Sequence, residues 1–391
     1  MQYKISKPVR LIELFGGIGT QAMALRDLGV DFEHWRLSEW EVNSVKSYRQ
    51  IHMPNIEKDF SERYEKEKLV DILLDIGISN DGKEPMERKS IERKGEKWLR
   101  ETFNNFMITK NIGSIVNRSG KDLKVVDTDK YEYIVTWSFP CQDLSLSGLQ
   151  KGMSEGEGTR SGLCWEVIRI LSECKELGEM PQILLMENVS QIHSKKNIKD
   201  FERLLNKLED LGYVNFYQDL NGKNYGVAQN RDRTFMFSIL KSEIGDNTYI
   251  FPEPIKLEKR LKDYLEDKVD EKYYINTEKA EQLIGTLIDK GVLPRKRNTY
   301  SKKNMGSSDE NRIPYGEPSD VAHTVLARDY KGLSNYGSNG VIEKDERAIG
   351  IDLASRNPDE RDIANCIKTV QRGIVNFAQA ETGVVEERYA E

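Results

Sequence analysis

The chain has 391 residues, of which 38% are hydrophobic and 32% are charged, and its net charge at neutral pH is −6. This composition is typical of a globular protein with room for two domains, and it excludes a chain that is disordered throughout. The negative net charge excludes a uniformly basic coat for nucleic acid, although a local basic patch is compatible with it.

The sequence shows no membrane span and no export signal. No apolar stretch approaches the roughly eighteen residues of a membrane helix, and residues 1–10 lack the hydrophobic segment of a signal peptide. The four cysteines, at positions 141, 164, 174 and 366, show neither paired metal-ligand spacing nor a disulfide framework. We therefore expect a cytoplasmic protein without a metal, whose thiols stay reduced.

The first regular segment predicts a strand, a turn and a helix in succession. Residues 9–14 (VRLIEL) predict a strand, residues 15–19 (FGGIG) a glycine turn, and residues 20–28 a helix. Glycines permit a tight turn and close approach of the backbone to a ligand, and the start of the helix offers free N–H groups. Many strand-to-helix turns contain glycine only because the backbone has to turn sharply, so this turn by itself is weak evidence for a binding site.

An acid after the next strand strengthens that evidence. Residues 34–38 predict a second strand that ends at Glu39 and Trp40, and Glu39 lies 20 residues beyond Gly19. An acid at this distance commonly hydrogen-bonds the ribose hydroxyls of a bound nucleotide. The turn and the acid together indicate a nucleotide-type α/β unit.

Cys141 is the most distinctive residue of the chain. Residues 131–139 (YEYIVTWSF) predict a buried strand, and Pro140, whose φ is fixed, comes directly before the cysteine. In open α/β sheets ligands bind at this end of the strands. Most free cysteines are small buried hydrophobes, but the polar and glycine-rich residues that follow indicate a surface loop and favour a catalytic thiol.

An acid reaches the same edge of the sheet through a crossover helix. Residues 163–177 have helical spacing, and residues 182–186 (QILLM) predict a short buried strand that ends at Glu187. A helix between two strands is the connection that parallel pairing requires. We therefore expect Glu187 and Cys141 to lie at one sheet edge.

Residues 224–239 predict a turn followed by an alternating strand. Gln229, Arg231 and Arg233 are spaced by two and so point to one face. Such a triplet alone is more often a solvated strand edge. Beside a candidate nucleophile and a candidate acid, it favours a functional site.

Taken in order, these segments resemble the motifs of the DNA (cytosine-5) methyltransferase family. The family motifs FxGxG, PCQ, ENV and QxRxR stand here at Phe15 to Gly19, Pro140-Cys141-Gln142, Glu187-Asn188-Val189 and Gln229/Arg231/Arg233. The stretches SFPCQDLS, GTRSGL and LLMENV are similar to restriction-modification and phage members. The resemblance implies a Rossmann-like α/β sheet that binds S-adenosylmethionine, with a second, smaller, mostly β target-recognition domain.

The resemblance also implies a covalent mechanism on a cytosine flipped out of duplex DNA. Cys141 as thiolate would add to carbon 6, and Gln142 would help to extrude the base. Glu187, as an acid with a raised pKa, would bond N3 and the exocyclic amine, while Arg233, and secondarily Arg231, would hold the base carbonyl. The sequence does not identify the base that removes the carbon 5 proton.

For the methyl donor, the resemblance implies contacts along the glycine turn and the two strand ends. Glu39 would bond the ribose, and Trp40 would lie against adenine. The family carries an acid before the isoleucine of the third strand, and the best alignment, over residues 111–116 (NIGSIV), puts Ser114 and Ile115 there. The remaining expected contacts are Phe15, Gly17, Ile18, Gly19, Pro140 and Leu163.

We expect a catalytic domain over residues 1–245 and a target-recognition region over residues 246–391. The charge-rich residues 57–105 exceed the corresponding connection of minimal family members, which indicates a helical insertion of unknown purpose. Residues 293–304 (LPRKRNTYSKKN) are either a DNA-contacting patch or a solvated charge run. A faint repeat, offset by 42 residues and starting at Asp320, indicates a duplicated strand unit or a coincidence.

The family's closing segments, RxLTxxE…GF and a GNS-containing stretch, are not recognisable before Glu391. The chain is then truncated, completed by a second polypeptide, or divergent at its end. Three functions stay open: a DNA cytosine-5 methyltransferase, a catalytically silent DNA-binding module, and a tRNA cytosine methyltransferase. The long recognition region with its basic patch favours duplex DNA as the partner. The sequence does not reveal the oligomeric state, although a monomer is favoured.

Overall fold

The computed structural model describes residues 2–140 and 161–264, together with the backbone of four strands between residues 322 and 376. The chain divides into two compact units. The first is made of residues 1–219 and 233–251, and the second of residues 220–232 and 252–389. Cys141 and Gln142 lie outside the described residues.

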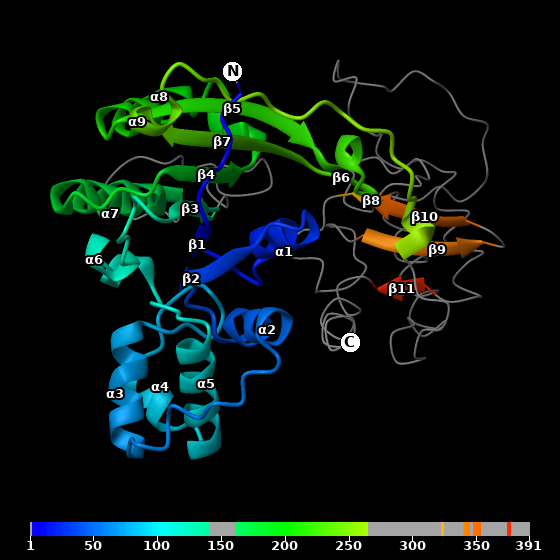
Figure 1. Cartoon of the computed structure of the whole chain (residues 1–391). Coiled ribbons are helices and arrows are strands. Elements are labelled where there is room, and N and C mark those ends of the chain that lie inside the picture. The colour runs from blue at the N-terminus through cyan, green and yellow to red at the C-terminus, as the bar shows by residue number, and fades with distance from the viewer. Residues whose placement is uncertain are drawn as a thin grey trace. The chain divides into compact units, whose positions relative to one another are not determined.

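Four parallel strands form the centre of the first unit (Figure 1). β1 (Val9–Leu14) lies between β2 (Phe32–Ser38) and β3 (Glu132–Trp137), and β4 (Ile183–Asn188) pairs with β3 on the far side. All six residues of β1 and of β3 are buried, as expected for strands covered on both faces. The predicted α/β fold and the predicted parallel pairing of the strands before Cys141 and Glu187 are confirmed.

Two further strands make the sheet mixed. β7 (Asp232–Leu240) pairs antiparallel with β4, and β5 (Tyr213–Asn221) lies beyond β7, so the order is β2-β1-β3-β4-β7-β5. Asn188 near the end of β4 lies opposite Thr234 near the start of β7. The start of β7 therefore lies at the edge of the sheet where the parallel strands end.

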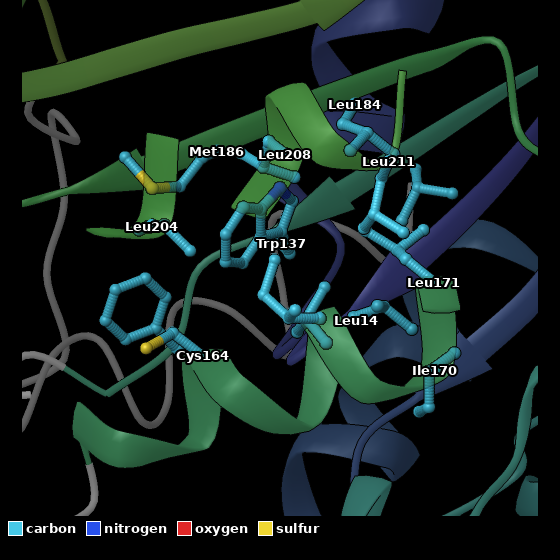
Figure 2. Packing of buried hydrophobic residues seen from close by; sticks show 14 of the residues in the cluster. Leu14, Trp137, Cys164, Ile170, Leu171, Leu184, Met186, Leu204, Leu208 and Leu211 are labelled. Carbon is cyan, nitrogen blue, oxygen red and sulfur yellow. The ribbon is translucent and has the colours of Figure 1, made fainter. Parts of the chain in front are cut away.

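Helices cover both faces of the sheet. α7 (Cys164–Leu177) and α8 (Ile198–Asp210) bury their apolar faces against one side, in the main core of the unit. Figure 2 shows this core, in which Trp137 of β3 lies among side chains of both helices and the neighbouring strands. On the opposite face Ala22 of α1 (Thr20–Asp27) packs against Leu11 of β1.

A separate helical cluster lies beside the edge strand β2. α3 (Lys66–Ile76), α4 (Arg88–Glu92) and α5 (Glu96–Ile108) pack against α2 (Val42–His52) (Figure 1). Their shared core is separate from that of the sheet, and its fully buried members include Val45, Leu69, Leu73, Ile91, Leu99, Phe103 and Phe106. This stretch of sequence thus forms a small helical core of its own.

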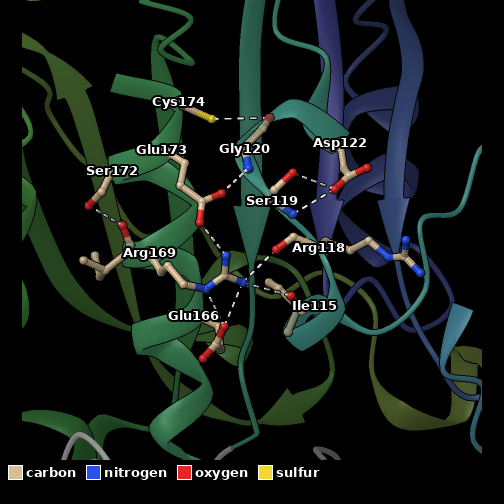
Figure 3. A network of polar contacts seen from close by, with 11 residues as sticks. Ile115, Arg118, Ser119, Gly120, Asp122, Glu166, Arg169, Ser172, Glu173 and Cys174 are labelled. Atoms are coloured by element: carbon tan, nitrogen blue, oxygen red, sulfur yellow. Dashed lines mark hydrogen bonds and ion pairs between the residues drawn. The ribbon is translucent and has the colours of Figure 1, made fainter. Parts of the chain in front are cut away.

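The segment between α5 and β3 contains no strand where the third family strand was expected. Residue 111 makes one isolated bridge to Leu37, and the chain then forms the 3₁₀ turn Ile115–Asn117 and α6 (Gly120–Leu123). Arg169 of α7 holds this segment, since its Nη2 donates to the Arg118 carbonyl at 2.7 Å (Figure 3). The Glu173 carboxylate also accepts a hydrogen bond from the Gly120 N–H, at 2.7 Å.

The remaining elements are short. The first unit also contains the 3₁₀ turns Ser161–Leu163 and Ser190–His193 and the helix α9 (Lys241–Ile244). The second unit contains the 3₁₀ turns Gly222–Tyr225 and Leu261–Tyr264 and the strands β6 (Gln229–Asn230), β8 (Ala322–His323), β9 (Asn339–Lys344), β10 (Arg347–Asp352) and β11 (Ile374–Asn376).

The strands of the second unit form two small sheets. β6 pairs parallel with β8, and β9 pairs antiparallel with both β10 and β11. Residues 293–304 and most of the faint repeat lie outside the described residues. In the part of the chain that the structure describes, no helix has the length and apolarity to cross a membrane.

Candidate active site

The ends of the four parallel strands bring the predicted residues into one row. Leu14 lies opposite Ser38 and Trp137, and Trp137 lies opposite Met186. The next residues on these strands are Phe15, Glu39, Ser138 and Glu187. The glycine turn, the acid after β2, the segment before Cys141 and the acid of β4 therefore share the edge at which open α/β sheets bind ligands.

The glycine turn has an unusual backbone. Its positive φ values are 57° at Phe15, 55° at Gly17 and 81° at Gly19. The end of β2 holds the turn, because the Ser38 carbonyl accepts from the Phe15 N–H at 2.8 Å and Glu39 Oε2 accepts from the Gly17 N–H at 2.9 Å. Within the described residues, a Cβ built on Gly17 would meet no atom within 4 Å. As far as the structure is described, the turn thus leaves open space over Gly17.

Backbone groups fix the carboxylate of Glu39. Its Oε1 accepts from the N–H groups of Trp40 and Glu41, both at 2.8 Å, and its Oε2 accepts from Gly17. Burial holds the pKa of the Glu39 carboxyl above its usual value, against these N–H groups, which lower it. A carboxylate has about four acceptor positions, so the group retains capacity to accept from ligand hydroxyls.

Asn111 anchors the main chain of Glu39, a role that sequence reasoning missed. Asn111 Oδ1 accepts from the Glu39 N–H at 3.2 Å, and its Nδ2 donates to the Glu39 carbonyl at 2.9 Å. The side chain is buried, and its Oδ1 also accepts from the Gly113 N–H at 2.8 Å. The signal that could have found it is the pair Asn111-Ile112, a polar residue before an isoleucine inside the aligned segment.

Ser114 and Ile115 occupy different surroundings. The Ser114 N–H donates to the carbonyl of Ile76 in α3 at 3.0 Å, and the Ile115 side chain is buried in the main core. The structure thus brings Asn111 to Glu39 and places Ser114 against the end of α3.

The other residues expected around the methyl donor lie near the same strand ends. Trp40 is half-buried and its carbonyl accepts from the Ser79 N–H at 2.8 Å, while Ile18 is partly buried in the glycine turn. Leu163 directly precedes α7 and packs against the main core, and Pro140 is partly buried.

Glu187 and Arg233 form an ion pair at the ends of β4 and β7. Arg233 Nε lies 3.0 Å from Glu187 Oε1, and the two side chains are 15% and 21% exposed, respectively. Arg233 lies two residues before Phe235, which is directly opposite Glu187, so the pair spans a diagonal of the antiparallel ladder. The exposure leaves both groups within reach of a ligand.

Asn188 links the strand that carries Glu187 to the segment before Cys141. Its buried side chain donates from Nδ2 to the Phe139 carbonyl at 3.1 Å, and its Oδ1 accepts from the Val189 N–H at 2.9 Å. The bond fixes the chain one residue before Pro140. Asn188 therefore holds the described segment that ends at Pro140, a contact that sequence reasoning did not predict.

Arg231 belongs to the second unit, in contrast to Arg233. It lies between β6 and β7, its N–H donates to Asn221 Oδ1 at 3.3 Å, and its carbonyl accepts from the Gly222 N–H at 3.0 Å. The expected strand is interrupted at this residue, because β7 begins at Asp232.

Comparisons with known proteins identify the family of the chain. A family model described as C-5 cytosine-specific DNA methylase matches residues 74–350. The chain is 35% identical over 275 residues to the orphan methyltransferase M.SssI of Spiroplasma monobiae, covering 69% of this chain and 68% of that protein. It is 34% identical over 272 residues to the type II methyltransferase M2.ScrFI of Lactococcus lactis subsp. cremoris, covering 68% and 70%.

A solved structure supports the fold. The methyltransferase EhMeth of Entamoeba histolytica superposes with a TM-score of 0.51 over 99% of this chain and 100% of that chain, at 14% identity. The matched family model spans well over half of the chain, and two relatives exceed 30% identity over two thirds of their length. The chain therefore belongs to the C-5 cytosine-specific DNA methylase family and is an enzyme of the DNA (cytosine-5) methyltransferase type.

Proposed function

We propose that the chain transfers a methyl group from S-adenosylmethionine to carbon 5 of a cytosine flipped out of duplex DNA, through a covalent adduct with Cys141. The observation that carries the proposal is the 3.0 Å Glu187–Arg233 pair, on the strand whose Asn188 bonds the segment before Cys141. Membership of the family supports cytosine in DNA as the substrate.

The residues at the glycine turn fit S-adenosylmethionine. The open space over Gly17 suits a ligand in close contact with the backbone, and the Glu39 carboxylate suits ribose hydroxyls. Trp40, Asn111 and Ile112 follow on the side where adenine would lie. When bound, S-adenosylmethionine supplies the electrophilic methyl group that becomes attached to carbon 5.

The chain's own residues activate the cytosine ring. Cys141 Sγ as thiolate forms a bond to carbon 6, and negative charge moves toward N3 and carbon 5. When the base enters, Arg233 turns to the carbonyl oxygen of the base, and Glu187 takes up a proton from solvent. Glu187 then donates this proton toward N3. Removal of the carbon 5 proton by a base then restores the ring double bond and expels the Cys141 thiolate.

A methylation assay tests the proposal. The purified chain, with S-adenosylmethionine and a pool of duplexes of varied sequence, should form 5-methylcytosine detectable by mass spectrometry of the nucleosides. The Cys141→Ala variant should form none and should still bind DNA. Turnover in this variant, or none in the wild type, would overturn the proposal; salt-sensitive DNA binding without turnover would instead indicate a binding module.

A further inference from the structure

The glycine turn rests on side chains that neither the motifs nor the mechanism assigns. A bulky aromatic residue rarely adopts the φ of 57° found at Phe15, so the surrounding structure must hold the turn in this form. The end of β2 holds one side of it through Ser38 and Glu39. The other side lies on α2.

Two residues four positions apart on α2, Tyr48 and His52, contact the turn directly. His52 Nε2 lies 3.0 Å from the Ile18 carbonyl, which can only accept, so the proton is on Nε2. A Cβ built on Gly19 would lie 2.3 Å from His52 Nε2 and 2.6 Å from Tyr48 Cε2. Both rings therefore press against the backbone at Gly19.

Tyr48 also ties α2 to the strand that precedes the turn. Its hydroxyl donates to Glu13 Oε2 at 2.5 Å, and Glu13 Oε1 accepts from the Ala22 N–H of α1 at 3.3 Å. Because the Tyr48 hydroxyl donates to Glu13, His34 Nδ1 donates to the Tyr48 oxygen at 2.8 Å. One series of hydrogen bonds thus connects β1, α1, α2 and β2.

We propose that Tyr48 and His52 are positioning residues that hold the 15–19 turn in the form that binds the methyl donor. The inference rests on the proposed function, because it takes the turn to be the S-adenosylmethionine site. When the turn is already held in one conformation, binding the ligand costs less conformational entropy. Tyr48 and His52 should therefore increase the affinity for S-adenosylmethionine.

Titration calorimetry with S-adenosylmethionine on the full chain tests the inference. His52→Phe keeps a ring but removes the donor, and should weaken binding about tenfold, as expected for the loss of one well-placed hydrogen bond. His52→Gln places an amide N–H near the position of Nε2 and should restore most of the affinity. Tyr48→Phe, which loses the bond to Glu13, should weaken binding by a similar factor.

A matched control separates this role from general packing. Tyr64, which packs edge-on against Phe103 in the helical cluster, loses only a hydroxyl in Tyr64→Phe, and that variant should bind as the wild type does. All titrations are made below the melting temperature of each variant. KM for S-adenosylmethionine should rise in His52→Phe while kcat changes little.

The outcomes distinguish the two proposals. If the folded wild type does not bind S-adenosylmethionine, the proposed function fails, and this inference fails with it. If the wild type binds and folded His52→Phe and Tyr48→Phe bind equally well, the inference alone is overturned. Equal losses in His52→Phe and His52→Gln would also contradict it, because the hydrogen bond would then have no part in the effect.

Discussion

Glu187 and Glu13 are both carboxyls on the central sheet, but their surroundings suit them to different roles. Glu187 pairs with Arg233 and keeps 21% of its side chain exposed, so a ligand can reach it. Glu13 is 1% exposed and accepts from the Tyr48 hydroxyl and the Ala22 N–H. Burial raises the pKa of Glu13 to about 7. These surroundings fit the proposed roles, in which Glu187 reacts with the base and Glu13 supports the glycine turn.

Replacing Glu187 by Gln should lower the rate of methyl transfer by roughly 10²- to 10⁴-fold, because the amide cannot deliver a proton to N3. DNA affinity should change little. Single-turnover formation of 5-methylcytosine at saturating DNA measures the effect. The matched control is Glu202→Gln on the exposed side of α8, which should retain the wild-type rate. A loss below about threefold in Glu187→Gln would contradict the acid role.

Glu13 should make stability depend on pH. Its pKa rises from 4.5 to about 7 on folding, so the folded state binds the proton more tightly. The contribution of Glu13 to the free energy of unfolding is fully present below pH 4.5 and is lost as the pH rises through about 7. The loss amounts to at most about 3 kcal/mol. The free energy of unfolding of the wild type, minus that of Glu13→Gln, should fall across this window.

Urea unfolding at several pH values measures that difference. The subtraction is needed because burial lowers the pKa of His34 to about 4, so His34 makes stability rise with pH in nearly the same range. A difference between wild type and Glu13→Gln that stays constant from pH 4.5 to 8 would show that Glu13 does not titrate in this way.

Among the elements, the sheet strands could be predicted from sequence and the contacts between segments could not. The strand predicted at residues 9–14 has the same bounds in the structure, because a short apolar run between turn residues has few alternatives. Residues 111–116 show the limit. Their place depends on Asn111 bonding Glu39 and on Ser114 bonding α3, and both partners are distant in sequence.

The difference between strand patterns and long-range contacts also explains which site residues could be predicted from the sequence. Glu39 and the glycine turn directly follow strand ends, and Glu187 lies near the end of β4, so the strand pattern alone brings them to one edge. Arg233 reaches the same edge because it lies near the start of the antiparallel strand β7. Tyr48 and His52 lie on α2, whose sequence shows only an amphipathic helix. Their contact with the turn becomes visible only when α2 is packed in place.

Gly113 provides a test at the scale of elements. Its φ is +82°, and a Cβ would lie 2.3 Å from the Ile76 carbonyl oxygen, a backbone atom that cannot move aside alone. Gly113→Ala should therefore destabilise the chain by about 2 kcal/mol or more and loosen the segment that carries Asn111. Gly29→Ala is the matched control, since Gly29 has φ +69° but no described atom within 4 Å of the added Cβ.

Thermal unfolding of both variants measures the difference. Gly29→Ala should lose only about 1 kcal/mol of stability, because alanine is strained in this backbone conformation but meets no neighbouring atom. Equal losses in the two variants would show that the contact between residue 113 and α3 does not constrain this segment.

At the scale of the whole molecule, most of the proposed chemistry belongs to one unit. The glycine turn, Glu39, Asn111, Glu187 and Arg233 all lie in the first unit, whereas Arg231 lies in the second. The family match runs from residue 74 to residue 350 and so includes parts of both units. We therefore expect the first unit to hold the methyl donor and the reacting base, and propose that the second contributes to reading the DNA.

A trapping experiment can detect the proposed covalent adduct with Cys141. Duplexes of varied sequence that carry 5-fluorocytosine lack the proton whose removal frees the enzyme, so an adduct should accumulate in the presence of S-adenosylmethionine. Mass spectrometry should find the chain joined to one DNA strand with an added methyl group, and should find no such species with Cys141→Ala. A wild-type preparation that methylates ordinary DNA but forms no adduct with fluorinated DNA would contradict the covalent mechanism.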